Sequence, residues 1–327
     1  MDISNLGLNS SSFNFSLGHI GKNSSRSNPK PISIYDFFEI SSKLGFSGVE
    51  FPYFRFCKDN DIELVKNYLK NKDLFCILDC STPLNEQEIK NIIPVAKHFK
   101  TDIIRIKVSN ILCCDRKSIR TSWDEFINEI ILRIKSLIPY LKDYQIKLAI
   151  ENHQDLDSYD LVKIFDKLNS DYVGVNFDVG NALATLESPM GFAKRIVDKI
   201  ILVNLKDYKV KKSKYGFRLI QCPFGDGMVF NRNLSNFLQK HFSSLNHILE
   251  IGALQSRNIE IDRDGFWKNF REFSDNEMIN FFDFIKNNEI NPNRSWKTPW
   301  ENRLSPNKIV DHEMNQVFKS IQNLKDY

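Results

Sequence analysis

The chain of 327 residues is predicted to fold as a (β/α)8 barrel, an α/β fold, with a C-terminal helical extension. Eight short apolar runs, typical of buried strands, alternate with stretches of helical periodicity. Their spacing is near the roughly 30 residues that one βα unit of such a barrel occupies. A doubly wound open sheet would also alternate strands and helices, but no G-x-G-x-x-G motif follows the first run. The barrel is therefore the better prediction.

The predicted strands are nearly continuous in apolar residues, as expected for a parallel sheet covered by helices on both sides. The clearest run, Ile-Lys-Leu-Ala-Ile at 146–150, ends abruptly in Glu151, Asn152 and His153. Side chains alternate along a strand, so Glu151 and His153 should point the same way. The eight predicted strands are 3–8, 48–51, 74–78, 103–108, 146–154, 173–178, 200–207 and 247–251.

The segments between these strands carry helix signals. Ser33 with Asp36, and Ser122 with Glu125, have the spacing of capping boxes. Pro139 is expected to kink or end the helix that begins after Ser122. The predicted helices are 33–44, 60–71, 85–98, 122–141, 157–169, 189–198 and 232–241.

The character of the sequence changes beyond Trp267. A helix is predicted over 275–286, and the stretch 287–304 is rich in Asn, Pro and Trp. Ser305 and Pro306 then begin a helix with one apolar face. We interpret residues 1–287 as the barrel and residues 288–327 as an extension packed on it, not as a second domain.

Composition narrows the class of protein. A net charge of +4, from 45 basic and 41 acidic residues, gives no argument for binding nucleic acid or a membrane surface. No apolar run approaches the roughly 18 residues that span a bilayer, and no signal peptide is recognised at the N-terminus. A cytoplasmic protein is expected. The six cysteines show no C-x-x-C spacing, which favours buried free thiols over a zinc ribbon or disulfides.

Four predicted strands end in groups that can bind a cation: Glu151, Asp178, Asn204 and Glu250. They lie 27, 26 and 46 residues apart, but the C-terminal ends of parallel barrel strands converge on one face. A single acid at a strand end is usually a helix cap or a solvated loop residue. Three carboxylates buried together without a cation would repel one another, so we predict a shared metal site. Oxygen ligands suit Mg²⁺ or Mn²⁺ better than Zn²⁺ or Cu²⁺.

These motifs resemble the xylose isomerase-like TIM barrel family over roughly residues 1–285. The family includes sugar phosphate isomerases/epimerases, keto-sugar 3-epimerases, inosose dehydratase, hydroxypyruvate isomerase and endonuclease IV. The ordered set of motifs identifies this superfamily better than it identifies a substrate. The residues that carry the resemblance are Ile150-Glu151-Asn152-His153, Phe177-Asp178-Val179-Gly180-Asn181, Asn204-Leu205-Lys206-Asp207, Gly225-Asp226-Gly227 and Leu249-Glu250.

The resemblance implies a divalent metal held by Glu, Asp, His and Glu from the fifth to the eighth strand. Glu151, Asp178 and Glu250 match three of these ligands, whereas Asn204 stands where the family has histidine. An amide oxygen can bind a hard cation but is neutral, so Mn²⁺ or Mg²⁺ is favoured, with Co²⁺ or Zn²⁺ as further candidates. We hypothesise that the metal is retained. The resemblance also makes Glu151 and Glu250 the catalytic pair for proton transfer.

Other residues are candidates for contact with the substrate, each with a structural alternative. His153 could bind a hydroxyl or be a satisfied structural histidine. Lys206 could neutralise an oxyanion or a phosphate, or pair with Asp207 at the surface. Arg257 and Arg105 could bind an anionic substituent, although an arginine is most often a salt-bridge partner. The predicted substrate-binding residues are Glu50, His153, Asn181, Lys206 and Arg257.

The favoured function is a divalent-metal-dependent isomerase or epimerase of a sugar, keto-sugar or polyol derivative, working through an enediolate. The alternative is a lyase of the same superfamily, of the keto-polyol dehydratase type. An endonuclease IV-like repair enzyme is less favoured, because four of the six histidines lie outside the strand-end motifs. A catalytically degenerate barrel is the fourth interpretation, kept open by Asn204. A small sugar substrate is expected and no nucleic-acid or membrane partner, and a homo-oligomer is compatible with the sequence.

Overall fold

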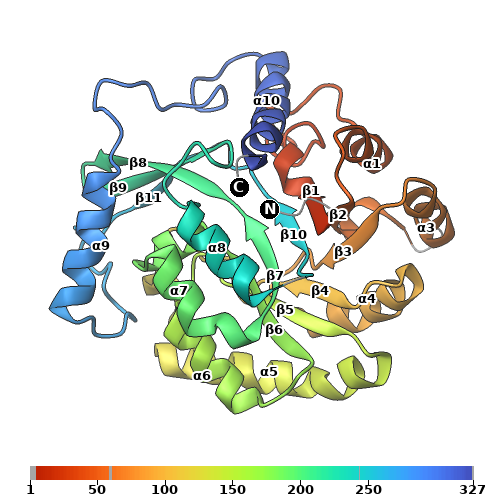
Figure 1. Ribbon diagram of the computed structural model, residues 1–327, viewed down its shortest axis with the longest axis horizontal. Coiled ribbons are helices and arrows are strands. Elements are labelled where there is room, and N and C mark those ends of the chain that lie inside the picture. The colour runs from red at the N-terminus through yellow and green to blue at the C-terminus, as the bar shows by residue number, and fades with distance from the viewer. Residues whose placement is uncertain (1–4, 59–60, 243, 326–327) are drawn as a thin grey trace.

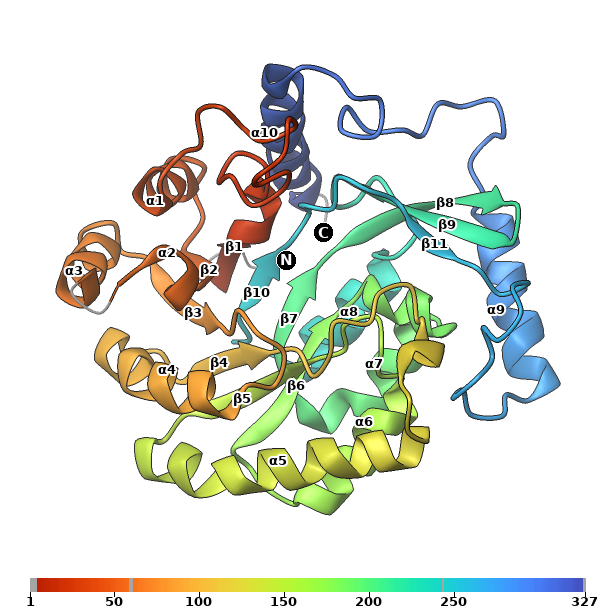
Figure 2. The same cartoon turned by 180° about the vertical axis from the view of Figure 1, so that it is seen from behind.

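The computed structural model describes residues 5–58, 61–242 and 244–325. Eight parallel strands close into a barrel in which each strand pairs with the next barrel strand along the chain. Helices enclose this ring of strands (Figures 1 and 2), so the predicted (β/α)8 barrel is confirmed. The barrel strands are β1 (Leu6–Asn9), β2 (Gly48–Pro52), β3 (Phe75–Asp79), β4 (Ile103–Ile106), β5 (Lys147–Glu151), β6 (Val173–Asp178), β7 (Ile200–Leu205) and β10 (His247–Leu249).

The helices follow the predicted segments closely. Capping boxes at Ser33 and Ser122 begin two of them, as predicted. The helix does not end at Pro139, as one of the two expectations had it, but continues to Tyr144. Pro139 lies on the exposed face, where water can bind the carbonyl that loses its partner. The helices are α1 (Ile34–Lys43), α2 (Tyr53–Phe56), α3 (Ile62–Asn71), α4 (Glu86–Phe99), α5 (Trp123–Tyr144), α6 (Ser158–Leu168), α7 (Pro189–Ile196) and α8 (Arg232–His241).

The chain leaves the barrel after β7 to form a second sheet that the sequence analysis did not predict. The predicted strand 200–207 is divided, since β7 ends at Leu205 and β8 (Asp207–Ser213) begins beyond Lys206. In this second sheet β9 (Gly216–Cys222) lies between β8 and β11 (Arg257–Ile259), antiparallel to both.

Three barrel strands are shorter than predicted. The predicted strand 103–108 ends at Ile106, 146–154 spans only Lys147–Glu151, and 247–251 ends at Leu249. Parts of the predicted strand 3–8 and helix 60–71, namely residues 3, 4 and 60, lie outside the described residues.

Apolar side chains fill the barrel interior below the C-terminal ends of the strands. Ile77, Ile103, Leu202 and Ile248 form a buried cluster there, against Phe75. A Cβ at Gly48 would lie only 2.4 Å from the Phe75 ring, so a glycine at this position makes room for the ring. Because this part is packed with apolar groups, the polar side chains gather at the C-terminal strand ends.

The segment after the last barrel strand contains two helices, which pack against different parts of the protein. Helix α9 (Asp275–Asn287) lies beside the β8–β9–β11 sheet (Figures 1 and 2), where the rings of Phe217 and Phe281 are 5.9 Å apart.

Helix α10 (Pro306–Leu324) packs against the segment that follows β1. Its buried Glu313 accepts hydrogen bonds from the backbone N–H groups of Phe15 (2.7 Å) and Ser16 (2.9 Å), and from the Ser16 hydroxyl. The predicted C-terminal helix is therefore present, and its buried carboxylate is hydrogen-bonded to the first βα connection.

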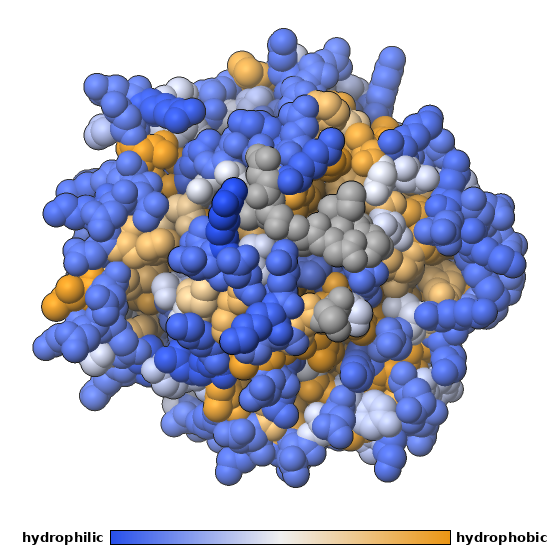
Figure 3. Space-filling model, in the orientation of Figure 1, coloured by the Kyte–Doolittle hydropathy of each residue, from blue (hydrophilic) through white to orange (hydrophobic). Residues whose placement is uncertain are grey.

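On the face seen in Figure 3, hydrophilic residues cover most of the surface and leave apolar areas between them. Among the described residues, no helix is long and apolar enough to cross a membrane. All six cysteines are free thiols, as expected, and Cys113 is the one that is not fully buried.

Candidate active site

The barrel brings the predicted carboxylates together. Glu151 and Asp178 are the last residues of β5 and β6, and Glu250 directly follows β10. One carboxylate oxygen from each lies within 4.8 Å of the others. Glu151 and Asp178 are fully buried, whereas the Glu250 side chain keeps 13% of its surface exposed. Parallel strands thus place residues from distant parts of the sequence around one point.

Lys206 supplies a cation to this cluster. It follows β7 directly, and its Nζ binds Oδ2 of Asp178 and lies 3.3 Å from Oε1 of Glu250. Burial opposes its charge, but the neighbouring carboxylates outweigh burial and raise the pKa of Lys206. Lys206 is therefore charged and bridges two of the three carboxylates.

Arg105, on β4, supplies the second cation. One guanidinium nitrogen lies 3.1 Å from both Glu50 and Asp79, and the other contacts Glu151 at 2.5 Å and Glu250 at 3.4 Å. Five carboxylates thus share two buried cations. With all five ionised, the negative charge at this end of the barrel would exceed that of the two cations, and a further cation would favour this ionised state.

Local charge divides the carboxylates into two groups. For Glu250, burial alone would raise the pKa, but Lys206 and Arg105 outweigh it and lower the pKa to about 2. For Glu151, burial is likewise outweighed, mainly by Arg105, and the pKa is lowered. In contrast, burial dominates for Asp178 and raises its pKa to about 7, and it raises the pKa of Glu50 to about 8. Glu151 and Glu250 are therefore the two carboxylates that the neighbouring cations hold most firmly in the ionised form.

The Asp178 carboxylate is held by the turn that follows β6. Its Oδ1 accepts hydrogen bonds from the backbone N–H groups of Gly180 (3.0 Å) and Asn181 (3.1 Å). Asn152 binds the backbone of Asp178 through both ends of its amide, at 2.7 and 3.0 Å. Because Oδ1 is occupied in this way, Oδ2 faces the carboxylate cluster and Lys206.

Asn204 lies on β7 beside these groups. Its Nδ2 donates a 2.7 Å hydrogen bond to Oε2 of Glu250. Its Oδ1 is buried and has no hydrogen-bond partner among the described residues. A buried acceptor without a donor is costly, and a cation bound by the carboxylates would satisfy it. The donor set, three carboxylates and one amide oxygen, fits a hard divalent cation.

The other predicted residues occupy different positions around the cluster. Asn181 donates a 3.0 Å hydrogen bond to Oε1 of Glu151 and so orients that carboxylate. Glu50 is fully buried and contacts Arg105, which places it beneath the cluster. His153 lines the cavity next to the cluster, and its Nδ1 lies 3.2 Å from the carbonyl oxygen of Ile111. Burial lowers the pKa of His153 to about 4, so the imidazole is neutral at physiological pH.

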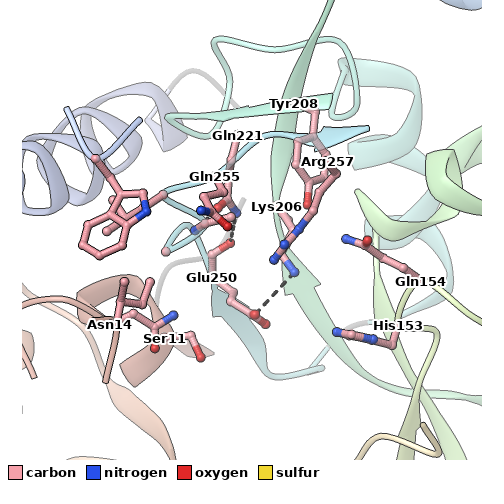
Figure 4. A pocket seen from close by; sticks show the side chains of 15 residues that line it. Ser11, Asn14, His153, Gln154, Lys206, Tyr208, Gln221, Glu250, Gln255 and Arg257 are labelled. Carbon is pink, nitrogen blue, oxygen red and sulfur yellow. Dashed lines mark hydrogen bonds and ion pairs between the residues drawn. The ribbon is translucent and has the colours of Figure 1, made fainter. Parts of the chain in front are cut away.

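A cavity of about 250 Å³ opens over Glu250 and Lys206. Figure 4 shows both side chains at its base, with His153 on one side and Asn14 and Ser11 on the other. This volume lies near the lower end of the range for small-molecule sites, roughly 300–1,000 Å³, and suits a ligand of monosaccharide size. The cavity is lined by Ser11, Asn14, Ile20, His153, Gln154, Lys206, Tyr208, Gln221, Glu250, Gly252, Ala253, Leu254, Gln255, Arg257 and Trp300.

Several of these residues were not singled out from the sequence. Trp300 comes from the C-terminal extension, and its ring packs 5.9 Å from Phe15 with the guanidinium of Arg26 stacked over it at 3.5 Å. Nothing in the local sequence signals that position. Asp79 was also missed, although it is the last residue of β3 and the same rule of strand ends would have identified it.

Comparison with known proteins supports the fold. The family described as "Xylose isomerase-like TIM barrel" matches residues 38–260. A structure of a xylose isomerase-like TIM barrel protein from Mycobacterium smegmatis in complex with magnesium is similar, with a TM-score of 0.58 and 13% identity over 89% of this chain and all of that one. A D-psicose 3-epimerase crystallised in the presence of D-fructose has a TM-score of 0.57 and 13% identity, over 87% of this chain and 99% of that one. At these identities the likeness shows a shared fold.

A relative of named activity is matched over part of its length. The 3-oxo-isoapionate decarboxylase of Pectobacterium atrosepticum is 22% identical over 125 residues, which are 38% of this chain and 46% of that protein. The chain thus matches less than half of that relative. Since the family match itself covers well over half of the 327 residues, the chain belongs to the xylose isomerase-like TIM barrel family.

Proposed function

We propose that the chain is a divalent-metal-dependent isomerase or epimerase of a sugar, keto-sugar or polyol derivative, acting by proton transfer through an enediolate. The observation that carries the proposal is the meeting of Glu151, Asp178 and Glu250 within 4.8 Å, with Glu250 lining the cavity. The proposed metal ligands are these three carboxylates and Oδ1 of Asn204, with Mn²⁺ or Mg²⁺ favoured. A bound divalent cation supplies a Lewis acid that polarises the carbonyl oxygen of the substrate.

The protein's own groups account for the proton transfer. Abstraction of a proton next to a carbonyl needs an ionised carboxylate within reach of that carbon. Glu151 and Glu250 meet the first requirement, because the pKa of each lies below its usual range. In this proposal one of them removes the proton and the other returns it, which gives epimerisation or aldose–ketose exchange. Asn181 and Arg105 keep the two carboxylates in place.

Lys206 has a separate role in the proposal. Negative charge develops on the substrate oxygen when the proton leaves the neighbouring carbon. The Lys206 ammonium lines the cavity and contacts Glu250, so it stabilises that charge. His153, neutral and on the side of the cavity that faces Asn14 and Ser11, is proposed to accept a hydrogen bond from a substrate hydroxyl through Nε2.

The test is hydrogen exchange in D₂O with a panel of keto- and aldo-sugars and added Mn²⁺. Deuterium at the carbon next to the carbonyl would reveal enolisation even without net conversion. We expect Glu250→Gln to reduce exchange by about 100-fold or more, and a chelator to abolish it. Exchange that survives both treatments would refute the proposal.

A lyase is the second candidate, favoured by the partial similarity to a decarboxylase. Loss of CO₂ from a 3-oxo acid that carries a hydroxyl group on carbon 2 leaves the same kind of enediolate that proton removal gives, so one site can serve both reactions. The products separate the two functions: released CO₂ or water identifies a lyase, and an isomeric sugar identifies an isomerase or epimerase.

A further inference from the structure

The cavity contains one cation that the carboxylate cluster does not use. Arg257 begins β11 and extends into the cavity toward the space above Glu250, beside Lys206 (Figure 4). Among the described residues no carboxylate lies within 4.0 Å of its guanidinium, in contrast to Arg105 and Lys206. The buried Nε of Arg257 has no hydrogen-bond partner in the described part of the chain.

An arginine in this state calls for an explanation. It is half-buried, and a guanidinium that loses water without gaining a partner is destabilised. The nearby carboxylate of Glu250 does not pair with Arg257, because it is bound by Lys206, Arg105 and Asn204. Arg257 is therefore a donor left free on the wall of the cavity, where a ligand can reach it.

The neutral residues that line the rest of the cavity indicate what the uncharged part of the ligand contains. Asn14, Ser11, Gln154 and Gln255 line the cavity with neutral amide and hydroxyl groups, which both donate and accept hydrogen bonds, as sugar hydroxyls do. A single planar guanidinium among neutral groups matches a carboxylate, which it can bind through two parallel hydrogen bonds. A phosphate dianion would call for more cations than this wall offers.

We infer that the natural substrate is a sugar acid whose carboxylate binds the Arg257 guanidinium while its hydroxylated chain lies over Glu250 and Lys206. The inference rests on the proposed function for the identity of the reacting end, and it adds the substrate class. It also assigns Arg257 as the residue that discriminates acids from neutral sugars.

Binding measurements test this without requiring turnover. The probes are the six-carbon acids D-gluconate and D-galactonate, the matching neutral polyols D-glucitol and D-galactitol, and D-glucitol 6-phosphate. Calorimetric titrations with and without Mn²⁺ should show at least one acid binding roughly 10- to 100-fold more tightly than its neutral polyol. Arg257→Met should abolish that preference.

Arg218→Met is the matched control. Arg218 lies on β9 and pairs in register with Asn258, the neighbour of Arg257 on β11. Its guanidinium stacks on Trp296 and does not line the cavity. This variant removes the same charge from the same sheet, and we expect it to keep the preference for acids. Arg257→Lys should retain part of it, because the charge remains while the paired hydrogen bonds are lost.

The results that overturn the inference are distinct from those that overturn the proposed function. Equal binding of acids and polyols, no binding of either acid, tighter binding of the phosphate ester, or an unchanged preference in Arg257→Met would each refute the sugar acid. Acid binding that depends on Arg257, without any metal-dependent hydrogen exchange, would leave this inference standing and refute the isomerase. Hydrogen exchange of neutral keto-sugars that is equal in wild type and Arg257→Met would refute this inference and leave the proposed isomerase standing.

Discussion

Nδ2 of Asn204 donates a 2.7 Å hydrogen bond to Oε2 of Glu250, so a neutral amide on β7 orients a carboxylate at the end of β10. The resemblance to the family places histidine at this position. The substitution keeps a hydrogen-bond donor toward Glu250 and exchanges an imidazole nitrogen for an amide oxygen as the group available to a cation.

The first prediction concerns this exchange. We expect Asn204→His to tighten Mn²⁺ binding by about tenfold, because an imidazole nitrogen donates its lone pair more strongly than a neutral amide oxygen does. Titration of the purified protein with Mn²⁺, followed by electron paramagnetic resonance of the free ion, measures the change. An unaltered affinity in a variant that keeps its melting temperature would show that residue 204 does not face the metal.

The second prediction concerns Arg105. Replacement by Met should lower the free energy of unfolding by roughly 3–5 kcal/mol, because buried Glu151 and Glu250 lose a partner. Urea denaturation monitored by circular dichroism gives the value. The control is Arg133→Met, which removes a partly exposed pair with Glu86 and should cost no more than about 1 kcal/mol. Equal losses in both variants would contradict the central role of Arg105.

The third prediction concerns pH and Glu313 on α10. Burial raises its pKa from 4.5 to about 7, against hydrogen bonds from Ser16 and Phe15. The folded state therefore holds a proton that the unfolded state has released, so this stabilisation is complete below pH 4.5 and is lost as pH rises through about 7.

Comparison with Glu313→Gln isolates this effect from other buried acids. Between about pH 5 and 7 the wild type should lose stability relative to the variant, by up to roughly 1.4 kcal/mol per pH unit. Chemical denaturation of both proteins across this range measures the difference. Parallel stability curves would show that Glu313 does not titrate on folding.

The fourth prediction concerns Trp300. Its ring lines the cavity and packs on Phe15 beneath Arg26. We expect Trp300→Ala to destabilise the protein by about 3 kcal/mol and to raise KM for the substrate with little change in kcat, because the ring shapes the cavity wall beside Phe15 and Arg26. The stability and the KM of Trp300→Phe should lie between those of the wild type and those of Trp300→Ala. A fall in kcat at constant KM would place Trp300 in the chemistry instead.

The barrel could be predicted because each parallel strand is a continuous apolar run bounded by helix signals. The same regularity located Glu151, Asp178 and Glu250, since a strand end is easily recognised where apolar residues give way to acid. Their proximity followed from the fold, and the structure places their oxygens within 4.8 Å.

The rest depended on contacts that no local pattern encodes. The run 200–207 is unbroken in sequence, so the point at which β7 leaves the barrel and β8 begins could not be located. Arg105 lies in an apolar strand and was expected either to bind an anion or to be a salt-bridge partner. The second expectation is confirmed, but its four carboxylate partners come from four other strands or strand ends and could not be identified from the sequence. Trp300 reaches the cavity through packing of the C-terminal extension, across nearly the whole length of the chain.

The hydrogen bonds from Phe15 and Ser16 to Glu313 have a consequence for biosynthesis. The connection after β1 is translated early and supplies Ser11, Asn14 and Ile20 to the cavity wall. Its anchoring carboxylate is translated almost 300 residues later. During translation the first connection therefore lacks these hydrogen bonds until α10 has been made and docks against it.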